Sequence, residues 1–374
     1  MKVINRIEKF IFEAPAWKLI LVIAALTLFK TGIWSIPNLG ESQAIADNPF
    51  TNPLPNPDAH YLLWSWLEPF LAWAIGIKSQ WQFFMFRLLT VVAFTLLFVR
   101  VAFAHLSSDM ARSSIVLFSV LPVSATAYFW VSGDALTLLL MLLALAFPAS
   151  LIFTFVVAVL LGMQHFEQGV FAAAGLLFAV ALSHRQQYVL KHSWKFCLCL
   201  LLGVVVGKLV LIGLFKHYAV EVSSGRAHWM QTHLVALLSQ FFYHFHFIAW
   251  SVLGLGWLAA LKFSDWGKKS LPFFLALAGL CLLLLPVSGD QTRVLAIVTF
   301  PLIFSYWLLN QDFLAKLSRR EVSVVFTLWA LMPWAWAWEG KPRWSAFPYD
   351  LAYILHHVFG WFEVPANAVI WPFG

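Results

Sequence analysis

The sequence predicts an all-α membrane protein, a bundle of about eleven transmembrane helices that forms one integral domain over residues 1–374. Composition is the first reason, because 61% of the residues are hydrophobic, 11% are charged and the mean hydropathy is +0.81. So little polar surface does not suit a water-soluble protein. The second reason is that apolar runs of about 20 residues, long enough to cross about 30 Å of hydrocarbon as helices, recur between residues 19 and 338.

The N-terminal segment predicts a cytoplasmic helix lying on the membrane surface. Residues 1–18 mix lysine and arginine with isoleucine and phenylalanine, which is typical of an interfacial helix. The apolar run 19–36 follows without a small-residue cleavage site, so it predicts the first transmembrane helix and not a signal peptide that is removed.

The positions of lysine and arginine predict the orientation, because cytoplasmic loops are enriched in them. The basic loops lie near residues 100–112, 184–195, 262–269 and 310–320. The outer face then receives residues 37–82, 132–134, 164–168, 215–235, 288–293 and 339–374. Most of the acidic residues fall on this outer face, so we expect the chemistry there. The compact chain, without eukaryotic targeting signals, favours a bacterial inner membrane.

Two outer segments are expected to carry helices that lie on the membrane. The first outer loop, 37–82, predicts a helix over residues 59–77, in which Glu68 and Pro69 disfavour a crossing of the bilayer. A crossing there would also move every later loop to the opposite side of the membrane, against the distribution of lysine and arginine. The tail, residues 339–374, predicts a short helix on the same face.

The stretch that leads into the surface helix holds the first catalytic candidate. Prolines stiffen residues 52–57, and Asp58 follows at the position of a helix N-cap. An aspartate before an apolar helix is more often a cap than a catalyst, so the residues alone leave both roles open.

Three basic residues, Lys30, Arg87 and Lys208, fall in the outer halves of predicted spans. Such groups either extend to the lipid headgroups or line a wet cavity that holds an anion. For Arg87, which is surrounded by phenylalanine and leucine, we favour a cavity with a lipid phosphate or diphosphate as its ligand.

Two outer turns supply further polar candidates. Arg293 either holds phosphate oxygens or pairs with Asp290 to cap the following helix. His165 and Glu167, in a turn between two apolar runs, are candidates to orient sugar hydroxyls. Because they are two residues apart, we expect them on different sides of a helix, which argues against a metal site built from them alone.

Several function classes lack support in the sequence. The net charge of +7 is explained by lysine and arginine spread over the cytoplasmic loops, so no nucleic-acid partner is predicted. The chain has no phosphate-binding P-loop, dinucleotide-binding glycine pattern, serine-hydrolase elbow or zinc-protease motif. No metal site is predicted.

The order of a first span, a long outer loop with Asp58, a surface helix and many short-looped spans resembles the GT-C superfamily of polytopic membrane glycosyltransferases. The turn Ser132-Gly133-Asp134 is similar to one in the mannosyltransferases of GPI-anchor synthesis. The resemblance implies a GT-C-like fold, a polyprenyl-phosphate sugar donor and Asp58 as the base that deprotonates the acceptor. Asp58 lacks the neighbouring second acid that many members carry, so a requirement for a divalent cation stays open.

We therefore predict an inverting hexosyltransferase of cell-envelope polysaccharide synthesis, which moves a sugar from a polyprenyl-phosphate donor to a lipid-linked or glycan acceptor at the outer face. The alternatives are an O-antigen-type polymerase or ligase that uses diphosphate-linked glycans, a flippase or transporter of lipid-linked glycans, and a non-catalytic assembly subunit. Asp58 is the predicted base. The predicted substrate-binding residues are His60, Tyr61, Arg87, Asp134, His165, Glu167, Arg226, Asp290 and Arg293.

Overall fold

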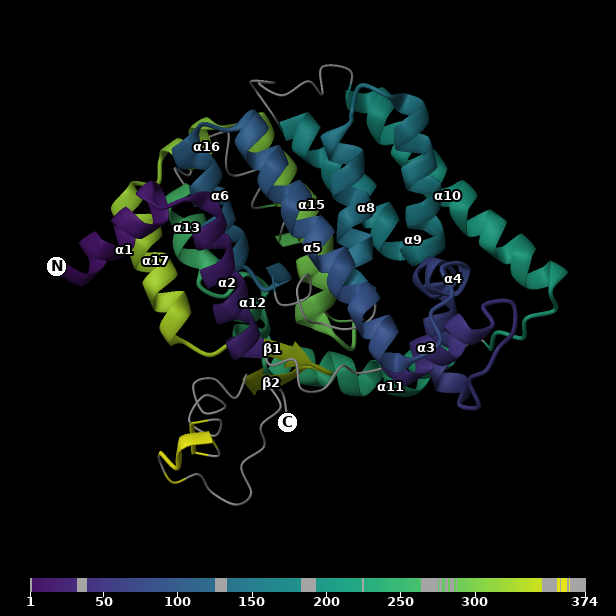
Figure 1. The fold of residues 1–374 in the computed structure, drawn as a ribbon. Helices are drawn as coiled ribbons and strands as arrows, with labels where there is room; N and C mark the ends of the chain where they lie inside the picture. Colours follow the sequence, from purple (N-terminus) through teal and green to yellow (C-terminus); the bar gives the residue numbers. More distant parts are fainter. Residues whose placement is uncertain are drawn as a thin grey trace.

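The computed structural model describes residues 2–31, 39–124, 133–182, 193–223, 225–263 and 288–344, with 275, 278–279, 282, 286, 355–356, 358–361 and 363. For 28, 29, 31, 58, 182, 193, 225–230 and 263 it describes the backbone alone. These residues are mostly helical (Figure 1). The longer helices are α1 (Lys2–Glu13), α2 (Ala16–Thr31), α5 (Gln80–His105), α6 (Ser108–Val120), α8 (Asp134–Ala146), α9 (Leu151–Leu182), α10 (Ser193–His217), α11 (Gly225–Tyr243), α15 (Gln291–Leu309) and α17 (Arg319–Leu331).

Four helices of the described ranges, α5, α9, α10 and α15, are long and apolar enough to cross a membrane. The number rises to six if two bent pairs, α1 with α2 and α11 with α12 (Phe245–Leu253), each count as one span. The structure thus supports a helical multi-pass protein, with fewer spans in the described ranges than the eleven predicted. One reason is length: α8 has 13 residues and rises only about 20 Å.

The N-terminal helix is separate from the first apolar helix, as predicted. The chain bends by 119° between α1 and α2, at Ala14 and Pro15. Arg112 of α6 fixes this corner, because its guanidinium donates to the backbone carbonyls of Ile11 and Ala14 at 2.6 and 2.7 Å. α1 therefore packs across α6 and α17 instead of continuing α2.

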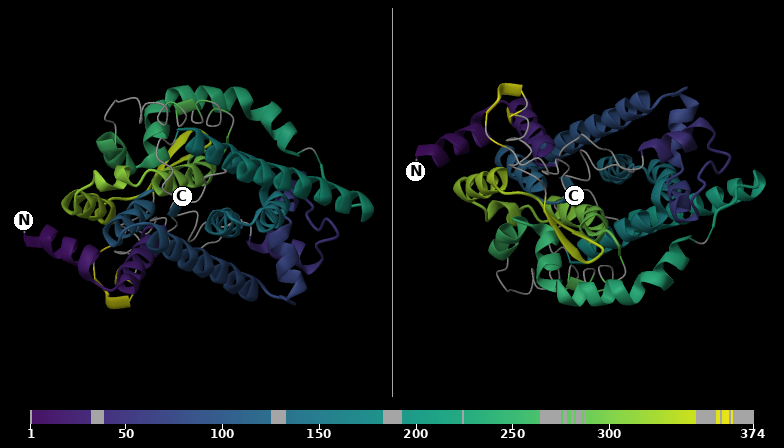
Figure 2. Two further views of the ribbon diagram at one scale, coloured as in Figure 1. Left: turned by 90° about the horizontal axis from the view of Figure 1, so that it is seen from above. Right: turned by 90° about the horizontal axis from the view of Figure 1, so that it is seen from below.

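One end of the bundle gathers the segments expected on the outer face. It holds α3 (Leu39–Asp47), the 3-10 helix η1 (Pro57–Trp64), α4 (Leu67–Ala74), α11 and a two-stranded hairpin (Figure 1). Figure 2 views this end from below, with the yellow hairpin near the middle and the purple α3 and α4 to one side. We call it the loop end of the bundle. The opposite end carries α16 (Asp312–Ala315) and the start of α17.

The prediction of a single surface helix over residues 59–77 is wrong, because the structure has two shorter helices there. η1 ends at Trp64, Ser65 and Trp66 interrupt the chain, and α4 begins at Leu67. The buried indole of Trp66 donates to the carbonyl of Pro49 at 2.7 Å, which fixes the interruption. With eight residues and a length of about 12 Å, α4 is too short to cross a bilayer.

A hairpin replaces the end of the last predicted span and the first residues of the tail, whereas most of the tail for which a short helix was predicted lies outside the described residues. α17 ends at Leu331, shortly before Pro333, and two antiparallel strands follow, β1 (Ala335–Trp338) and β2 (Lys341–Trp344). Two physical reasons favour the hairpin. Proline does not continue a helix, and alanine alternates with tryptophan in β1 with the period of a strand.

Helices α9 and α10 pack closely through their backbones. A Cβ added at Gly207 would lie 2.1 Å from the carbonyl oxygen of Val159, and one added at Gly162 would lie 2.2 Å from that of Val204. Gly203 and Gly207 are spaced four apart in α10, the spacing that lets two membrane helices approach closely. This contact positions the kinked helix α9, which carries part of the site.

Candidate active site at the loop end

Five charged side chains from four helices lie in the protein interior at the loop end. α4 contributes Glu68, α5 contributes Arg87, α8 contributes Asp134, and α15 contributes Arg293 with Asp290 as its N-cap. Four of these residues are less than 9% exposed, and the Arg293 side chain is 18% exposed. We call these five residues the charged cluster.

Glu68 and Arg87 form a buried, two-pronged ion pair. Arg87 Nε donates to Glu68 Oε1 at 3.1 Å and Nη2 donates to Oε2 at 2.9 Å, while Nη2 also donates to Ser42 Oγ at 3.0 Å. The sequence favoured an anion in a cavity as the partner of Arg87, whereas Glu68 already neutralises its charge. Arg87 Nη1 is buried without a hydrogen-bond acceptor in the described part of the chain.

Asp134 and Asp290 share Arg293. Arg293 Nε lies 2.9 Å from Asp290 Oδ2 and 3.8 Å from Asp134 Oδ2. Asp290 also caps α15, since its Oδ1 accepts from the Arg293 amide at 3.3 Å and from Trp336 Nε1 at 2.9 Å. The pairing and capping role weighed for Asp290 and Arg293 is therefore present in the structure, and phosphate binding by Arg293 stays a prediction.

Burial and hydrogen bonding act in opposite directions on Asp290. Burial raises the pKa of the Asp290 carboxyl above its usual range, and the Arg293 guanidinium, the Arg293 amide and the Trp336 indole all oppose this rise. Trp336 comes from β1, so the hairpin missed by the sequence prediction supplies a direct contact to the cluster. The signal that could have located it is the alternation of alanine and tryptophan in residues 335–338.

Asp134 stands at the start of α8, and its Oδ2 has only the ion pair with Arg293 at 3.8 Å. Its side chain is buried, and Oδ2 accepts no hydrogen bond from any donor within the described ranges. Gly133 precedes it with φ +74°, and a Cβ there would lie 2.4 Å from Gln164 Nε2. Gln164 donates to the Gly133 carbonyl at 3.2 Å and accepts from the Glu68 amide at 2.9 Å. This buried glutamine, absent from the predicted site, ties α4, α8 and α9 together.

The kink of α9 brings His165 and Glu167 together, contrary to expectation. His165 has an extended backbone (φ −161°, ψ 92°) inside α9, where the sequence predicted an outer turn between two spans. His165 Nδ1 lies 3.4 Å from Glu167 Oε2. The expectation of opposite sides assumed a continuous helix, and the break at His165 removes that geometry.

The cluster carries one more acidic group than arginine. Glu68 is balanced by Arg87, while Asp134 and Asp290 share the single charge of Arg293. An unbalanced buried carboxylate is costly, so the site gains stability when it takes up a proton or a positively charged group. This property suits a group that accepts a proton during a reaction.

Of the other predicted site residues, the structure describes the side chains of Tyr61 and His60. Tyr61 of η1 is close enough to Arg293 to interact electrostatically. His60 instead links two loops of this end of the bundle. Its Nε2 lies 3.0 Å from Asn52 Nδ2, and its Nδ1 accepts from the Ser223 amide at 3.1 Å. The side chains of Asp58 and Arg226 lie outside the described ones, so their predicted roles stay predictions.

Within the described ranges, no three histidine, cysteine, aspartate or glutamate side chains gather in a way that could hold a metal ion. No family model, curated protein or solved structure matches this chain.

Proposed function

We propose that this protein is a membrane glycosyltransferase, which moves a sugar from a polyprenyl-phosphate donor to a hydroxyl of a lipid-linked or glycan acceptor, with inversion. The observation that carries the proposal is the charged cluster, and within it the buried Asp134, whose Oδ2 lies 3.8 Å from Arg293 Nε and accepts no hydrogen bond within the described ranges. Glycosyl transfer from a lipid phosphate needs a carboxylate to take the acceptor proton and a cation to stabilise the leaving phosphate. The cluster offers both groups at the same end of the bundle.

The proposed reaction follows from this arrangement. The acceptor hydroxyl gives its proton to Asp134 Oδ2 while its oxygen bonds to the anomeric carbon, and the bond from that carbon to the phosphate oxygen breaks. As Asp134 becomes neutral, Arg293 loses one of its two negative partners. Its positive charge then favours the leaving phosphate, which gains negative charge in the same step. To His165 and Glu167, whose Nδ1 and Oε2 lie 3.4 Å apart, we assign the role of orienting sugar hydroxyls.

The proton acceptor has two candidates, which the same experiment separates. Asp58 is implied by the resemblance to GT-C enzymes, and Asp134 is supported by its burial and its place beside Arg293. Asp58 belongs to η1, which packs against α9. We place the proton transfer on Asp134 and treat Asp58 as the competitor.

The test is turnover by purified protein in nanodiscs, supplied with radiolabelled polyprenyl-phosphate sugars and lipid-linked acceptors. We expect Asp134→Asn to lower kcat by about 10²- to 10⁴-fold while donor binding persists, because the amide cannot take the proton. Asp47→Asn is the matched control, since Asp47 is an exposed aspartate of α3. Binding of the labelled donor is measured separately by filtration.

Each outcome has a distinct meaning. Loss of turnover in Asp58→Asn with normal turnover in Asp134→Asn moves the base to Asp58. Full turnover in both variants removes both bases from the mechanism. If no donor reacts but lipid-linked glycans bind, the proposal of a transferase is wrong, and a polymerase, ligase or flippase becomes the better assignment.

A further inference from the structure

The apolar side of α1 is covered by the protein itself. Ile11 and Phe12 are buried, and Ile7 and Phe10 are partly buried against the same core. The helix packs on α17 and α6, and Figure 1 shows the purple α1 crossing the yellow-green α17. A helix that is embedded in a membrane surface inserts its apolar side between the lipids. In α1 this side is already taken, so the helix meets its surroundings through its polar side.

The polar side of α1 carries three exposed basic residues. Lys2, Arg6 and Lys9 share one face, because residues three and four apart in a helix lie one above the other. None of the three forms an ion pair with an acid in the described part of the chain. We call these three residues the basic stripe. Glu13, which is also exposed, follows at the end of the same face.

Acids of neighbouring elements are already paired with other cations. Asp109 Oδ2 lies 2.8 Å from Arg319 Nη2, and Glu321 Oε1 lies 3.0 Å from Lys262 Nζ. The Arg319 guanidinium lies 5.2 Å from the centroid of the Phe12 ring, so the first of these pairs adjoins α1. These acids therefore do not neutralise the basic stripe, which is left to a negatively charged partner from outside the chain.

The start of α2 marks where lipid lies relative to the basic stripe. Trp17 and Leu21 are each 59% exposed, and the exposed Lys18 places its Nζ 5.4 Å from the centroid of the Trp17 ring. Tryptophan and lysine concentrate at the level of the lipid headgroups, while an exposed leucine suits the hydrocarbon below. The stripe on α1 precedes Trp17 by only a few residues, so it lies close to the headgroup layer.

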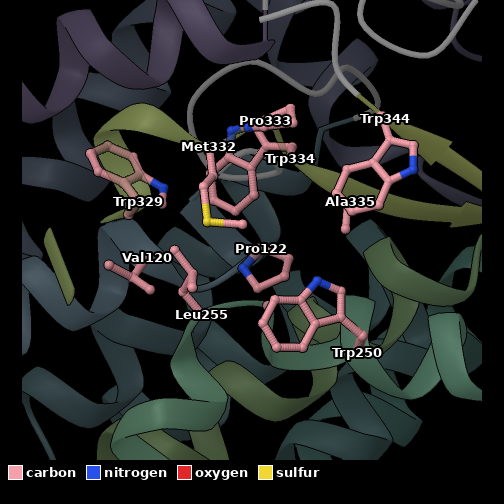
Figure 3. Close-up of a pocket in the computed structure, with 11 residues that line it drawn as sticks. Val120, Pro122, Trp250, Leu255, Trp329, Met332, Pro333, Trp334, Ala335 and Trp344 are labelled. Carbon is pink, nitrogen blue, oxygen red and sulfur yellow. The ribbon is translucent and has the colours of Figure 1, made fainter. Parts of the chain in front are cut away.

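The other end of α2 is fixed at the loop end. Lys30 Nζ donates to the carbonyl oxygen of Trp329 at 2.6 Å and to that of Met332, at the end of α17. Figure 3 shows Trp329, Met332 and Trp334 there, around a small pocket with room for about one water. α2 thus runs from the corner with α1 to the loop end, and the basic stripe belongs to the end opposite the charged cluster.

We infer that the basic stripe binds the phosphate groups of anionic phospholipids. Each lysine or arginine at a membrane surface raises the local concentration of anionic lipid by about 5-fold. Because the apolar side of α1 is covered, the contact depends on charge and weakens at high salt. An acidic protein segment would match the charge as well, but exposed Trp17 and Leu21 place lipid beside the stripe. The inference does not depend on the proposed glycosyl transfer.

The experiment measures lipid contact at α1 directly. In a variant in which Cys197, Cys199 and Cys281 are alanine, Asn5→Cys places a bimane label on an exposed position of α1. The protein is reconstituted in phosphatidylcholine nanodiscs that contain an equal small fraction of nitroxide-labelled phosphatidylglycerol or nitroxide-labelled phosphatidylcholine. We expect the phosphatidylglycerol to quench bimane as strongly as an at least about 5-fold higher concentration of the phosphatidylcholine, the effect of one basic residue.

Charge variants locate the contact on the basic stripe. The triple variant Lys2→Gln, Arg6→Gln and Lys9→Gln should quench equally with both lipids, and Glu13→Gln should increase the preference for phosphatidylglycerol. The matched control is Lys78→Gln, Lys216→Gln and Lys341→Gln, which removes three exposed lysines of other elements and should keep the preference.

Three results would overturn the inference. They are equal quenching by the two lipids in the protein with an intact stripe, a preference that survives in the stripe variant, and an equal loss of preference in the control. A preference that is lost in the stripe variant alone, and that falls at high salt, supports it.

Discussion

At the scale of single residues, each buried arginine of the loop end has an acidic partner from another part of the chain. Arg87 on α5 is paired by Glu68 on α4, and Arg293 is held by Asp290 and Asp134. Charges buried away from water are stable only with such partners, and removing one partner costs more than removing both. Glu68 was interpreted in the sequence only as a mark of a surface helix, yet it neutralises the most deeply placed arginine of α5.

This pairing predicts an asymmetry between single and double variants. Glu68→Gln leaves Arg87 buried without a counter-charge, so we expect the free energy of unfolding to fall by about 3 to 5 kcal/mol. The double variant Glu68→Gln with Arg87→Met should recover much of that loss, because no charge remains unpaired. The measurement is denaturation by SDS in mixed micelles.

Glu41→Gln is the control for the single variant, since Glu41 is an exposed acid of α3. A loss in Glu68→Gln no larger than in this control would mean that the ion pair does not stabilise the fold.

At the scale of elements, glycine decides how closely two helices pack. α9 and α10 meet where Gly162, Gly203 and Gly207 leave no room for a side chain. The same contact holds the two halves of α9 on either side of the kink at His165, because Gly162 and Gly169 both face Val204. The position of His165, which interacts electrostatically with Asp134, thus depends on α10, a helix that contributes none of the five charged residues.

Gly207→Ala tests this contact. Its Cβ would meet the Val159 carbonyl at 2.1 Å, so the helices must separate, and we expect a loss of about 1 to 3 kcal/mol in the free energy of unfolding. Gly213→Ala lies in the same helix with nothing within 4 Å, and should be neutral or stabilising by up to about 1 kcal/mol. Equal effects of the two substitutions, measured by SDS denaturation, would contradict close packing of α9 on α10.

At the scale of the whole molecule, the two ends of the bundle differ in the kind of charge pairing. The loop end holds buried pairs, whereas at the other end the pairs Arg319 with Asp109 and Lys262 with Glu321 are about half exposed. Exposed pairs contribute little to stability, so this end is held mainly by packing of α1, α6 and α17. The difference favours chemistry at the loop end.

The orientation of the molecule is tested at the two ends of α5. Lys78 and Ser108 are both exposed and lie just before and just after this helix, which rises about 39 Å. In a variant in which Cys197, Cys199 and Cys281 are alanine, Lys78→Cys should react with an impermeant maleimide in intact spheroplasts. Ser108→Cys should react only after permeabilisation. The reverse pattern would invert the proposed orientation, and equal labelling would mean that α5 does not cross.

Local properties of the sequence alone determined the helical, apolar character, the separate N-terminal helix and which segments gather at the loop end. Hydropathy, proline and lysine positions act over a few residues, so they can be read directly. The partner of Arg87, the kink that joins His165 to Glu167, the hairpin contact from Trp336 and the pocket around Trp329 were decided only by the tertiary structure. These contacts join helices distant in the sequence, and which groups meet depends on how the apolar faces pack together.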